Sequence, residues 1–360
     1  MRGLGDFYRY GRVTGLLIVL FPLLLVLSFA YQLAVWGIRF LYSRGVLKSL
    51  RPESRVISVG NITLGGSGKT PLTEYLARTL EPKTKVAVLL RGYRRPASGP
   101  GGQDDYSELG DEGSLLKENL GPGIIVQAGV DRAGLVRKLE SGGFRGVLLL
   151  DDGFQHWRIR RDLDIVCLDA SMPFGNGLLL PAGHLRETRQ GLRRAGVFCL
   201  TRCDQVEPEV LQKLERILKE INPAAAVIHT IHAPEYFYDL KIKTKFKPES
   251  LTHIRSGIVC GIARPQAFVR TLEDLHLDIR WKKFFSDHHS YTRREILDFS
   301  KEALSRDIRM LVTTQKDAQR LKAWVRELDL GLDILVLRIG LRVIRGQEEL
   351  DARLHSVCGF

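Results

Sequence analysis

The chain has 360 residues, with 54 Lys and Arg against 41 Asp and Glu, and carries a formal net charge of +13 at pH 7. This length exceeds one ordinary domain, and a hydrophobic fraction of 44% is enough to build a core. The basic balance favours an anionic partner, and composition does not choose among nucleic acid, a phospholipid surface and a phosphorylated substrate. The five cysteines include no Cys-x-x-Cys pair, which argues against a disulfide framework and predicts a cytoplasmic soluble part.

The first predicted element is a membrane helix near the N-terminus. The run from Val13 to Ile38 contains no charged residue, and a helix needs roughly 20 apolar residues to cross a bilayer core. Pro22 lies within the run and can kink it. The run is too long for the apolar part of a signal peptide, and no small-residue cleavage site follows it. The sequence therefore favours a membrane helix over a signal peptide or a buried core helix.

Basic residues flank this run on both sides and are more numerous after it. They are Arg2, Arg9 and Arg12 before the run, and Arg39, Arg44, Lys48, Arg51 and Arg55 after it. By the positive-inside rule, this asymmetry favours a cytoplasmic location for the body that follows. The same side chains favour an anionic leaflet. A helix that lies in the interface, instead of spanning the membrane, remains an alternative.

From residue 56 onward, short β-branched runs alternate with helical patterns. Strands are predicted at Val56–Val59, Val86–Leu90, Ile124–Val126, Val147–Leu150, Ile165–Leu168, Val197–Leu200, Ile258–Cys260, Met310–Thr313 and Ile334–Leu337. Helices are predicted at Pro71–Leu80 and Asp131–Glu140. This alternation indicates βαβ units and a mostly parallel sheet. A break near Glu207–Pro223 is the expected boundary of a second lobe.

A glycine-rich turn follows the first of these strands. It consists of Gly65, Gly66, Ser67 and Gly68, followed by Lys69 and Thr70. In such a turn, backbone N–H groups and the helix N-terminus bind phosphate oxygens. Lys69 would reach the β- and γ-phosphates, and Thr70 would bind Mg²⁺. Thr63 stands where the strict pattern has glycine, but the Lys-Thr pair and the flanking elements disfavour a turn that only ends a strand.

Two adjacent carboxylates end the apolar strand at Val147–Leu150. P-loop enzymes place such an acid beside the metal, which predicts metal-side roles for Asp151 and Asp152. Their side chains alternate in direction, so one is expected to hold the ion directly and the other through water. Gln155 and His156 follow at once, and a pair at this position can orient a nucleophile or a substrate phosphate. A solvated turn and a surface histidine are the alternatives.

Several further polar clusters occur along the chain. They are Arg91–Arg95, Gly110-Asp111-Glu112, Leu180–Glu187, Asp287-His288-His289 and Lys316-Asp317. The first suits a phosphate clamp, and a solvated basic turn is an alternative of nearly the same weight. The histidines lack the spacing of a zinc site, and an Asp–His couple formed in space is the more natural use of them. Lys316 and Asp317 suit either contact with a base or the cap of a following helix.

Together these segments resemble the tetraacyldisaccharide 4′-kinase family, the lipid A 4′-kinases of Gram-negative bacteria. The matching segments are Val59–Asn61, Gly65–Pro71, Arg91–Tyr93, Gly110–Glu112, Asp151–His156, Leu180–Glu187, Asp287–His289 and Lys316–Ala318. They occur in the order of the family and cover most of the chain. Asp-Asp-Gly-Phe-Gln-His beside this turn is highly specific, whereas each of the other segments alone would be weak.

The resemblance implies a substrate and a set of residue roles. The substrate would be a tetraacylated glucosamine disaccharide 1-phosphate, phosphorylated by ATP with Mg²⁺ at its 4′ hydroxyl on the cytoplasmic side of the inner membrane. Asp111 matches the catalytic acid of the family and His288 its partner, with His289 as a competitor for that role. The remaining matches are Tyr93 for the nucleotide, Glu187 for the metal, and Gln155, His156, Arg186 and Asp287 for the substrate. Lys69 and Asp151 also match catalytic positions.

The resulting expectation is a P-loop NTPase-type α/β fold in three parts. Residues 1–47 would form the membrane anchor and its basic flanks, residues 48–222 the P-loop kinase core, and residues 223–360 a smaller α/β lobe. An alternative function is a membrane-tethered P-loop switch that acts on a protein partner. A nucleic-acid-dependent ATPase is suggested only by charge and is opposed by the membrane run and by the lack of a reader motif, so nucleic acid is not expected as a partner. No obligate protein partner is implied either.

Overall fold

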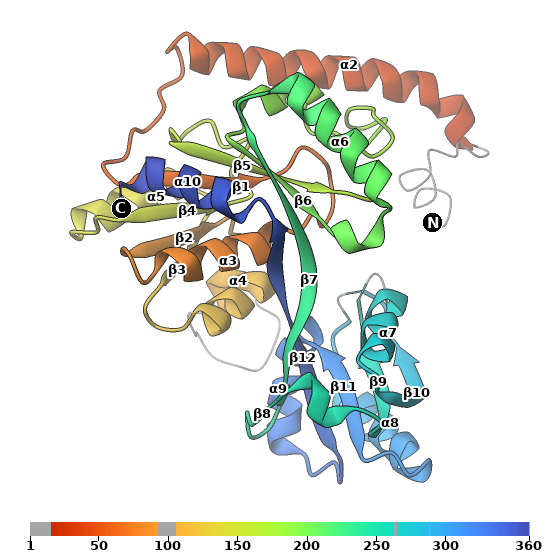
Figure 1. The fold of residues 1–360 in the computed structure, drawn as a ribbon. Coiled ribbons are helices and arrows are strands. Elements are labelled where there is room, and N and C mark those ends of the chain that lie inside the picture. The colour runs from red at the N-terminus through yellow and green to blue at the C-terminus, as the bar shows by residue number, and fades with distance from the viewer. Residues whose placement is uncertain (1–15, 93–105, 263–264, 288, 360) are drawn as a thin grey trace. The chain divides into compact units, whose positions relative to one another are not determined.

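The computed structural model describes residues 16–92, 106–262, 265–287 and 289–359, and Figure 1 draws its fold. Two predicted site residues, Tyr93 and His288, lie outside the described residues, as does the side chain of Asp111. The chain divides into two compact units. Unit 1 comprises Met1–Ile231 and Leu341–Phe360, and unit 2 comprises His232–Gly340.

Unit 1 is an α/β layer structure built on a parallel sheet. Its strands are β1 (Arg55–Gly60), β2 (Val86–Leu90), β3 (Ile125–Ala128), β4 (Val147–Asp151), β5 (Leu163–Asp169), β6 (Val197–Thr201) and the first part of β7 (Ala226–Asp239). They lie in the order β7-β6-β5-β1-β4-β2-β3, and the pairings described within this set are parallel. The expected mostly parallel α/β sheet is therefore confirmed. Its strands end along one edge, where ligands bind in open sheets of this type.

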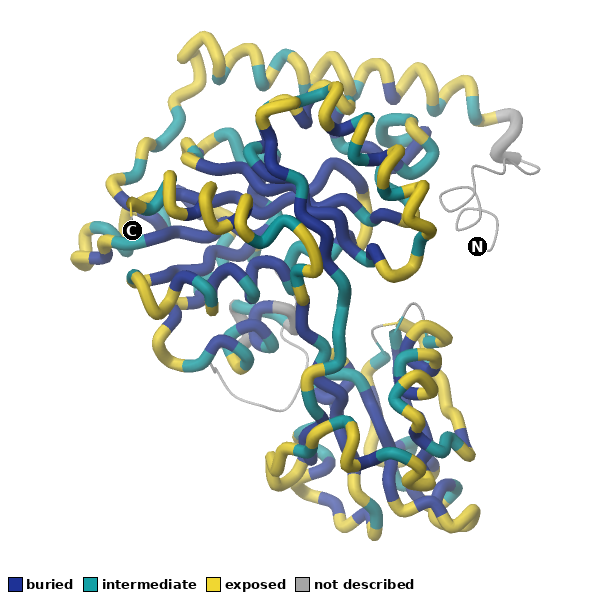
Figure 2. The backbone as a smooth tube through the Cα atoms, in the orientation of Figure 1, coloured by how far each residue is buried: buried dark blue, intermediate teal, exposed yellow. Residues whose placement is uncertain are grey.

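Both faces of this sheet are covered, as Figure 2 shows from the buried strands inside unit 1. The helices of unit 1 are α2 (Leu16–Ser43), α3 (Lys69–Leu80), α4 (Tyr106–Leu120), α5 (Arg132–Ser141), α6 (Pro208–Ile221) and α10 (Gln347–Cys358), with short 3₁₀ turns η1 (Arg189–Arg194) and η2 (Cys203–Gln205). Alternate side chains of β1 lie on opposite faces of the sheet. Ile57 packs in one cluster with Leu76 of α3, and Val56 packs in another with Val136 of α5. Strands buried on both faces read as continuous apolar runs, which is why the sequence revealed them.

Unit 2 is a smaller α/β unit. It contains β8 (Lys245–Phe246), η3 (Pro248–Leu251), β9 (Arg255–Cys260), α7 (Pro265–Asp274), β10 (Asp278–Phe284), α8 (Arg293–Ser305), β11 (Met310–Thr314), α9 (Gln315–Glu327) and most of β12 (Asp333–Arg345). β9 pairs in parallel with β10 and β11, and β11 pairs in parallel with β12. Helix α8 begins with a capping box in which Thr292 and Glu295 satisfy each other's backbone N–H groups.

The route of the chain between the units differs from a simple division after residue 222. The segment expected as a break forms helix α6, which buries Leu214 and Leu218 in unit 1. The chain enters unit 2 through β7 and returns through β12, so that α10 belongs to unit 1. No strand was predicted at β7, because His229, His232 and Pro234 interrupt its apolar pattern.

Helix α2 is the apolar element predicted near the N-terminus, and it continues through Pro22. The stretch Leu20–Ser43 is long and apolar enough to cross a membrane. Its outward residues are exposed, with Val26 at 65% and Trp36 at 63%. One face instead contacts unit 1. Ser28 Oγ donates to the Leu179 carbonyl at 2.9 Å and accepts from Ala182 N–H at 3.0 Å, and Tyr31 donates to the Arg186 carbonyl at 2.9 Å. An apolar helix with one docked face and exposed Leu, Phe and Trp suggests a membrane anchor.

Candidate active site

The glycine-rich turn lies between the end of β1 and the start of α3. Gly68 caps α3 in the left-handed region at φ 82°, and Gly65 has φ 108°, so both positions favour glycine. A Cβ added at Gly65 or Gly66 would meet no atom within 4 Å, so the turn has an open face. Thr63 is buried before the turn and forms a bridge with Leu185. The turn therefore does not need the glycine of the strict pattern at residue 63.

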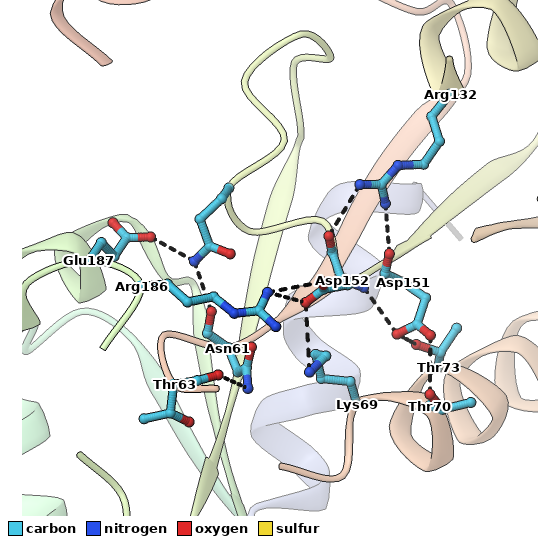
Figure 3. A network of polar contacts seen from close by, with 11 residues as sticks. Asn61, Thr63, Lys69, Thr70, Thr73, Arg132, Asp151, Asp152, Arg186 and Glu187 are labelled. Carbon is cyan, nitrogen blue, oxygen red and sulfur yellow. Dashed lines mark hydrogen bonds and ion pairs between the residues drawn. The ribbon is translucent and has the colours of Figure 1, made fainter. Parts of the chain in front are cut away.

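The Asp151 carboxylate closes one side of this turn. Strand β4 lies beside β1 with Val59 opposite Asp151, which places the carboxylate next to the start of α3. Asp151 accepts hydrogen bonds from the hydroxyls of Thr70 and Thr73, each at 3.2 Å (Figure 3). Its carboxylate also accepts from the Asp152 backbone N–H at 3.1 Å. The sequence-predicted metal residues Thr70 and Asp151 are thus brought together, with Thr73 as a partner that sequence reasoning missed.

The Asp152 carboxylate faces two cations. It lies 3.6 Å from Lys69 Nζ and accepts two hydrogen bonds from Arg186 Nη1, at 2.8 and 3.0 Å (Figure 3). Its backbone is left-handed at φ 51°, which turns its side chain away from that of Asp151. Burial would raise the pKa of Asp152, but the charges of Lys69, Arg186 and Arg132 outweigh it and hold that pKa below its ordinary value. Asp152 is therefore ionised at neutral pH.

Arg132 holds the backbone of both aspartates at the end of β4. Its guanidinium donates to the carbonyls of Asp151 at 2.7 Å and Asp152 at 3.2 Å, and its side chain is buried at the start of α5 (Figure 3). Such a fork satisfies carbonyls that the ending strand leaves free. Sequence reasoning missed this residue, because an arginine at a helix start resembles any solvated charge.

Glu187 lies in a second network beside the first. Its carboxylate accepts two hydrogen bonds from Arg194, at 2.9 and 3.0 Å, and a third from Gln155 Nε2 at 2.8 Å. Gln155 Nε2 also donates to the Asn61 carbonyl at 2.8 Å, which ties the network to the end of β1 (Figure 3). Arg194 in turn stacks 4.1 Å from the ring centroid of Phe154. Both carboxylate oxygens of Glu187 are thus bound by protein groups, and its role as a metal ligand stays a prediction.

His156 follows Gln155 in the same segment. Its imidazole is half-buried and neutral. Its Nε2 atom is buried with no hydrogen-bond partner among the described residues. Burial, followed by the charges of Arg132, Arg161 and Arg158, lowers the pKa of His156 to about 4. Below neutral pH this group therefore stays uncharged in the folded protein while it protonates in the unfolded chain.

Replacing His156 with glutamine is expected to flatten the pH dependence of stability between pH 4 and 6.5. In that window the unfolded histidine binds up to one proton that the folded one does not. The wild-type protein therefore loses stability as the pH falls from 6.5 towards 4, and this loss is absent above 6.5. Thermal unfolding midpoints at a series of pH values test this. His355→Gln, at an exposed position of α10, should keep the wild-type slope, and an equal slope in His156→Gln would contradict the prediction.

The other predicted site residues belong to unit 2 or are only partly described. Gly110 interrupts α4 at φ 66° and ψ −179°, and Asp111 follows it at the start of a new helical segment. Asp287 is an exposed residue of unit 2. His289, the competitor for the role of His288, is hydrogen-bonded to Glu295 at 3.1 Å and stacks on Phe285. Among the described residues, no group of three or more His, Cys, Asp and Glu side chains is arranged to hold a metal.

Comparison with known proteins identifies the family. The family model for tetraacyldisaccharide-1-P 4′-kinase, LpxK, matches residues 20–359. The chain is 39% identical to the tetraacyldisaccharide 4′-kinase of Anaeromyxobacter sp. (strain K), over 88% of this chain and 85% of the relative. It is 38% identical to that of Syntrophotalea carbinolica, over 89% and 90%. The crystal structure of LpxK from Aquifex aeolicus in complex with ATP is similar at a TM-score of 0.71 and 27% identity, over 94% of this chain and 99% of that one. The turn at Lys69, the paired aspartates and these matches together show that the chain belongs to the tetraacyldisaccharide-1-phosphate 4′-kinase family.

Proposed function

We propose that this chain transfers the γ-phosphate of ATP to the 4′ hydroxyl of a tetraacylated glucosamine disaccharide 1-phosphate. The observation that carries the proposal is the convergence of Lys69, Asp152 and Arg186 beside the glycine-rich turn. This arrangement supplies positive charge next to a turn suited to a triphosphate. The acceptor follows from the family to which the chain belongs.

Phosphoryl transfer depends mainly on positioning and on stabilising charge, because the protein makes little covalent contribution. In this proposal the backbone of residues 65–69 binds phosphate oxygens and Lys69 contacts the β- and γ-phosphates. Asp152 holds Lys69 and Arg186 in place as an ionised partner of both. Gln155, whose Nε2 is held by Asn61 and Glu187, is proposed to contact the substrate together with His156.

Thr70 and Asp151 would hold a magnesium ion. Their facing oxygen atoms lie 3.2 Å apart, and both are the hard oxygen ligands that Mg²⁺ prefers. Mg²⁺ commonly takes only one or two protein ligands when substrate phosphates complete its shell, so this pair fits the ion. When bound, the ion supplies positive charge to the β- and γ-phosphates. Asp152 is proposed to act on Lys69 and Arg186 and not as the direct ligand.

Asp111 is proposed to accept the proton of the sugar hydroxyl, with His288 tuning it. Replacing Asp111 with asparagine is then expected to lower kcat about 10²-fold, because a positioned acid–base group contributes on that order, while affinity for ATP is unchanged. Initial rates and ATP titrations on the purified protein test this. Glu112→Gln, one residue further on, is the matched control, and near-normal turnover by Asp111→Asn would remove Asp111 from the role of base.

Helix α2 is proposed to anchor the enzyme to the cytoplasmic leaflet of the inner membrane. Its exposed apolar residues suit the acyl region, and the basic residues that follow suit anionic headgroups. The acyl chains of the substrate confine it to the same membrane, so the anchor would raise the effective concentration at which enzyme and substrate meet.

The function is tested with full-length protein in detergent micelles. The protein is incubated with γ-labelled ATP and the tetraacyl disaccharide 1-phosphate, and the position of the new phosphate is determined by mass spectrometry and NMR. A product labelled at the 4′ position supports the proposal. ATP hydrolysis without a phosphorylated lipid, stimulated instead by a protein extract, would favour a P-loop switch. Wild-type protein that binds ATP but labels no lipid would refute the proposed acceptor.

A further inference from the structure

Residues at the ends of strands β5 and β6 hold the glycine-rich turn in place. Arg202 follows β6 directly, and its guanidinium forms an ion pair with Asp169 at the end of β5. The other terminal nitrogen of the same guanidinium donates to the Gly66 carbonyl at 2.9 Å. The neighbouring Thr201 hydroxyl donates to the Ser67 carbonyl at 3.2 Å, with the Leu168 carbonyl as a second acceptor at 3.4 Å. Two successive carbonyls of the turn are therefore held by side chains that the phosphate-binding pattern does not include.

Strand pairing fixes the position of both side chains. Asp169 lies opposite Thr201 in the parallel ladder of β5 and β6, and the Ala170 N–H donates to the Thr201 carbonyl at 3.0 Å. Asp169 also accepts from the backbone and hydroxyl of Ser171, at 3.1 and 2.7 Å. Arg202 itself adopts a left-handed backbone at φ 57°, which is uncommon for a residue other than glycine, and Thr201 is fully buried. The anchor is thus built into the sheet edge and is not a loose surface contact.

The direction of these two bonds bears on phosphate binding. In a trans peptide, the C=O and the following N–H point in opposite directions. Holding the Gly66 and Ser67 carbonyls towards β6 therefore turns the N–H groups of Ser67 and Gly68 away from β6. The Ser67 N–H donates to the Gly65 carbonyl at 3.2 Å, which closes the turn. The Gly68 N–H precedes Lys69, where the phosphate is expected.

We infer that Arg202 and Thr201 are positioning residues for ATP, which orient the turn through its Gly66 and Ser67 carbonyls. The inference rests on the proposed function only in placing ATP at this turn, and it does not depend on the acceptor. It explains why the guanidinium of Arg202 and the buried hydroxyl of Thr201, both at the end of β6, bind peptide carbonyls of the turn. Neither residue needs to touch the nucleotide.

The test measures affinity for the β,γ-methylene analogue of ATP by calorimetry, using full-length protein in detergent micelles. Arg202→Ala should weaken binding about tenfold, since a hydrogen bond from a charged group to a carbonyl is lost. Thr201→Val keeps the shape of the side chain and removes only its hydroxyl, and it should weaken binding about threefold. In turnover assays both variants should raise KM for ATP and leave KM for the lipid unchanged.

Arg137→Ala is the control, because it removes the same charge from an exposed position of α5. It should bind the analogue as the wild type does. Wild-type affinity in Arg202→Ala would overturn the inference, as would equal increases in KM for both substrates. A loss in Arg202→Ala without any loss in Thr201→Val would also overturn it, in favour of a direct charge effect on the triphosphate. If the wild type binds the analogue but phosphorylates no lipid, the proposed acceptor fails and this test still stands.

Discussion

Replacing Lys69 with methionine is expected to lower kcat/KM for phosphate transfer on the order of 10³-fold, with little change in folding. Lys69 opens α3 directly after the glycine-rich turn, and its ammonium is largely buried beside Asp152. A charge in such a partly dehydrated site acts on a transferring phosphate more strongly than it would in water. Methionine keeps the length and apolar stem of the side chain, so the loss measures the ammonium group.

The stability of this variant should remain close to that of the wild type. Asp152 retains two hydrogen bonds from Arg186 after Lys69 is removed, so its carboxylate is not left unpaired. Rates with saturating lipid and thermal unfolding of the same samples make the comparison. Lys138→Met, on the exposed side of α5, is the control and should leave both measurements unchanged. A Lys69→Met enzyme that retained more than a tenth of the wild-type rate would show that the turn is not the phosphate site.

Most strands of unit 1 could be predicted because the sheet buries them on both faces. Val56–Val59 and Val147–Leu150 are continuous apolar runs, and both are strands of the central sheet. β7 and β10 could not be predicted in this way. β7 has a half-exposed middle with His232 and Pro234, and β10 buries only Trp281 and ends in exposed residues that include two lysines. Their strand conformation is fixed by pairing with distant segments, which a local pattern does not record.

In the candidate site, the chemical types were predictable and the partners were not. The spacing before Lys69 and the strand end at Asp151 predicted a phosphate site and an acid beside it. The direction of the Asp152 carboxylate depends on its left-handed backbone, which sends it towards Lys69 and Arg186. Arg132 was missed for another reason. Its guanidinium binds the backbone carbonyls of Asp151 and Asp152, and nothing in the local sequence distinguishes such a residue from a surface charge.

Replacing Asp152 with asparagine is expected to reduce turnover about 10³-fold without raising the Mg²⁺ requirement. Asparagine tolerates the left-handed backbone at φ 51°, so the turn of the chain should persist. The change removes the negative charge between Lys69 and Arg186 and leaves two partly buried cations facing each other. This should lower the free energy of unfolding at pH 7 by about 2 kcal/mol, less than for a fully buried pair because the site retains some exposure.

The contribution of Asp152 to the free energy of unfolding should depend on pH. Because the folded pKa of Asp152 is held below its ordinary value of 3.8, its contribution is present above that pH and is lost as the pH falls through the folded pKa. The stability curves of Asp152→Asn and the wild type should therefore be separated at neutral pH and converge only in strong acid. Asp151→Asn is the matched partner, since it replaces the carboxylate facing Thr70. It should raise the Mg²⁺ concentration needed for half-maximal activity, whereas Asp152→Asn should not. If the two variants exchanged these behaviours, Asp152 would be the metal-side acid, and the link between backbone direction and function at this strand end would be wrong.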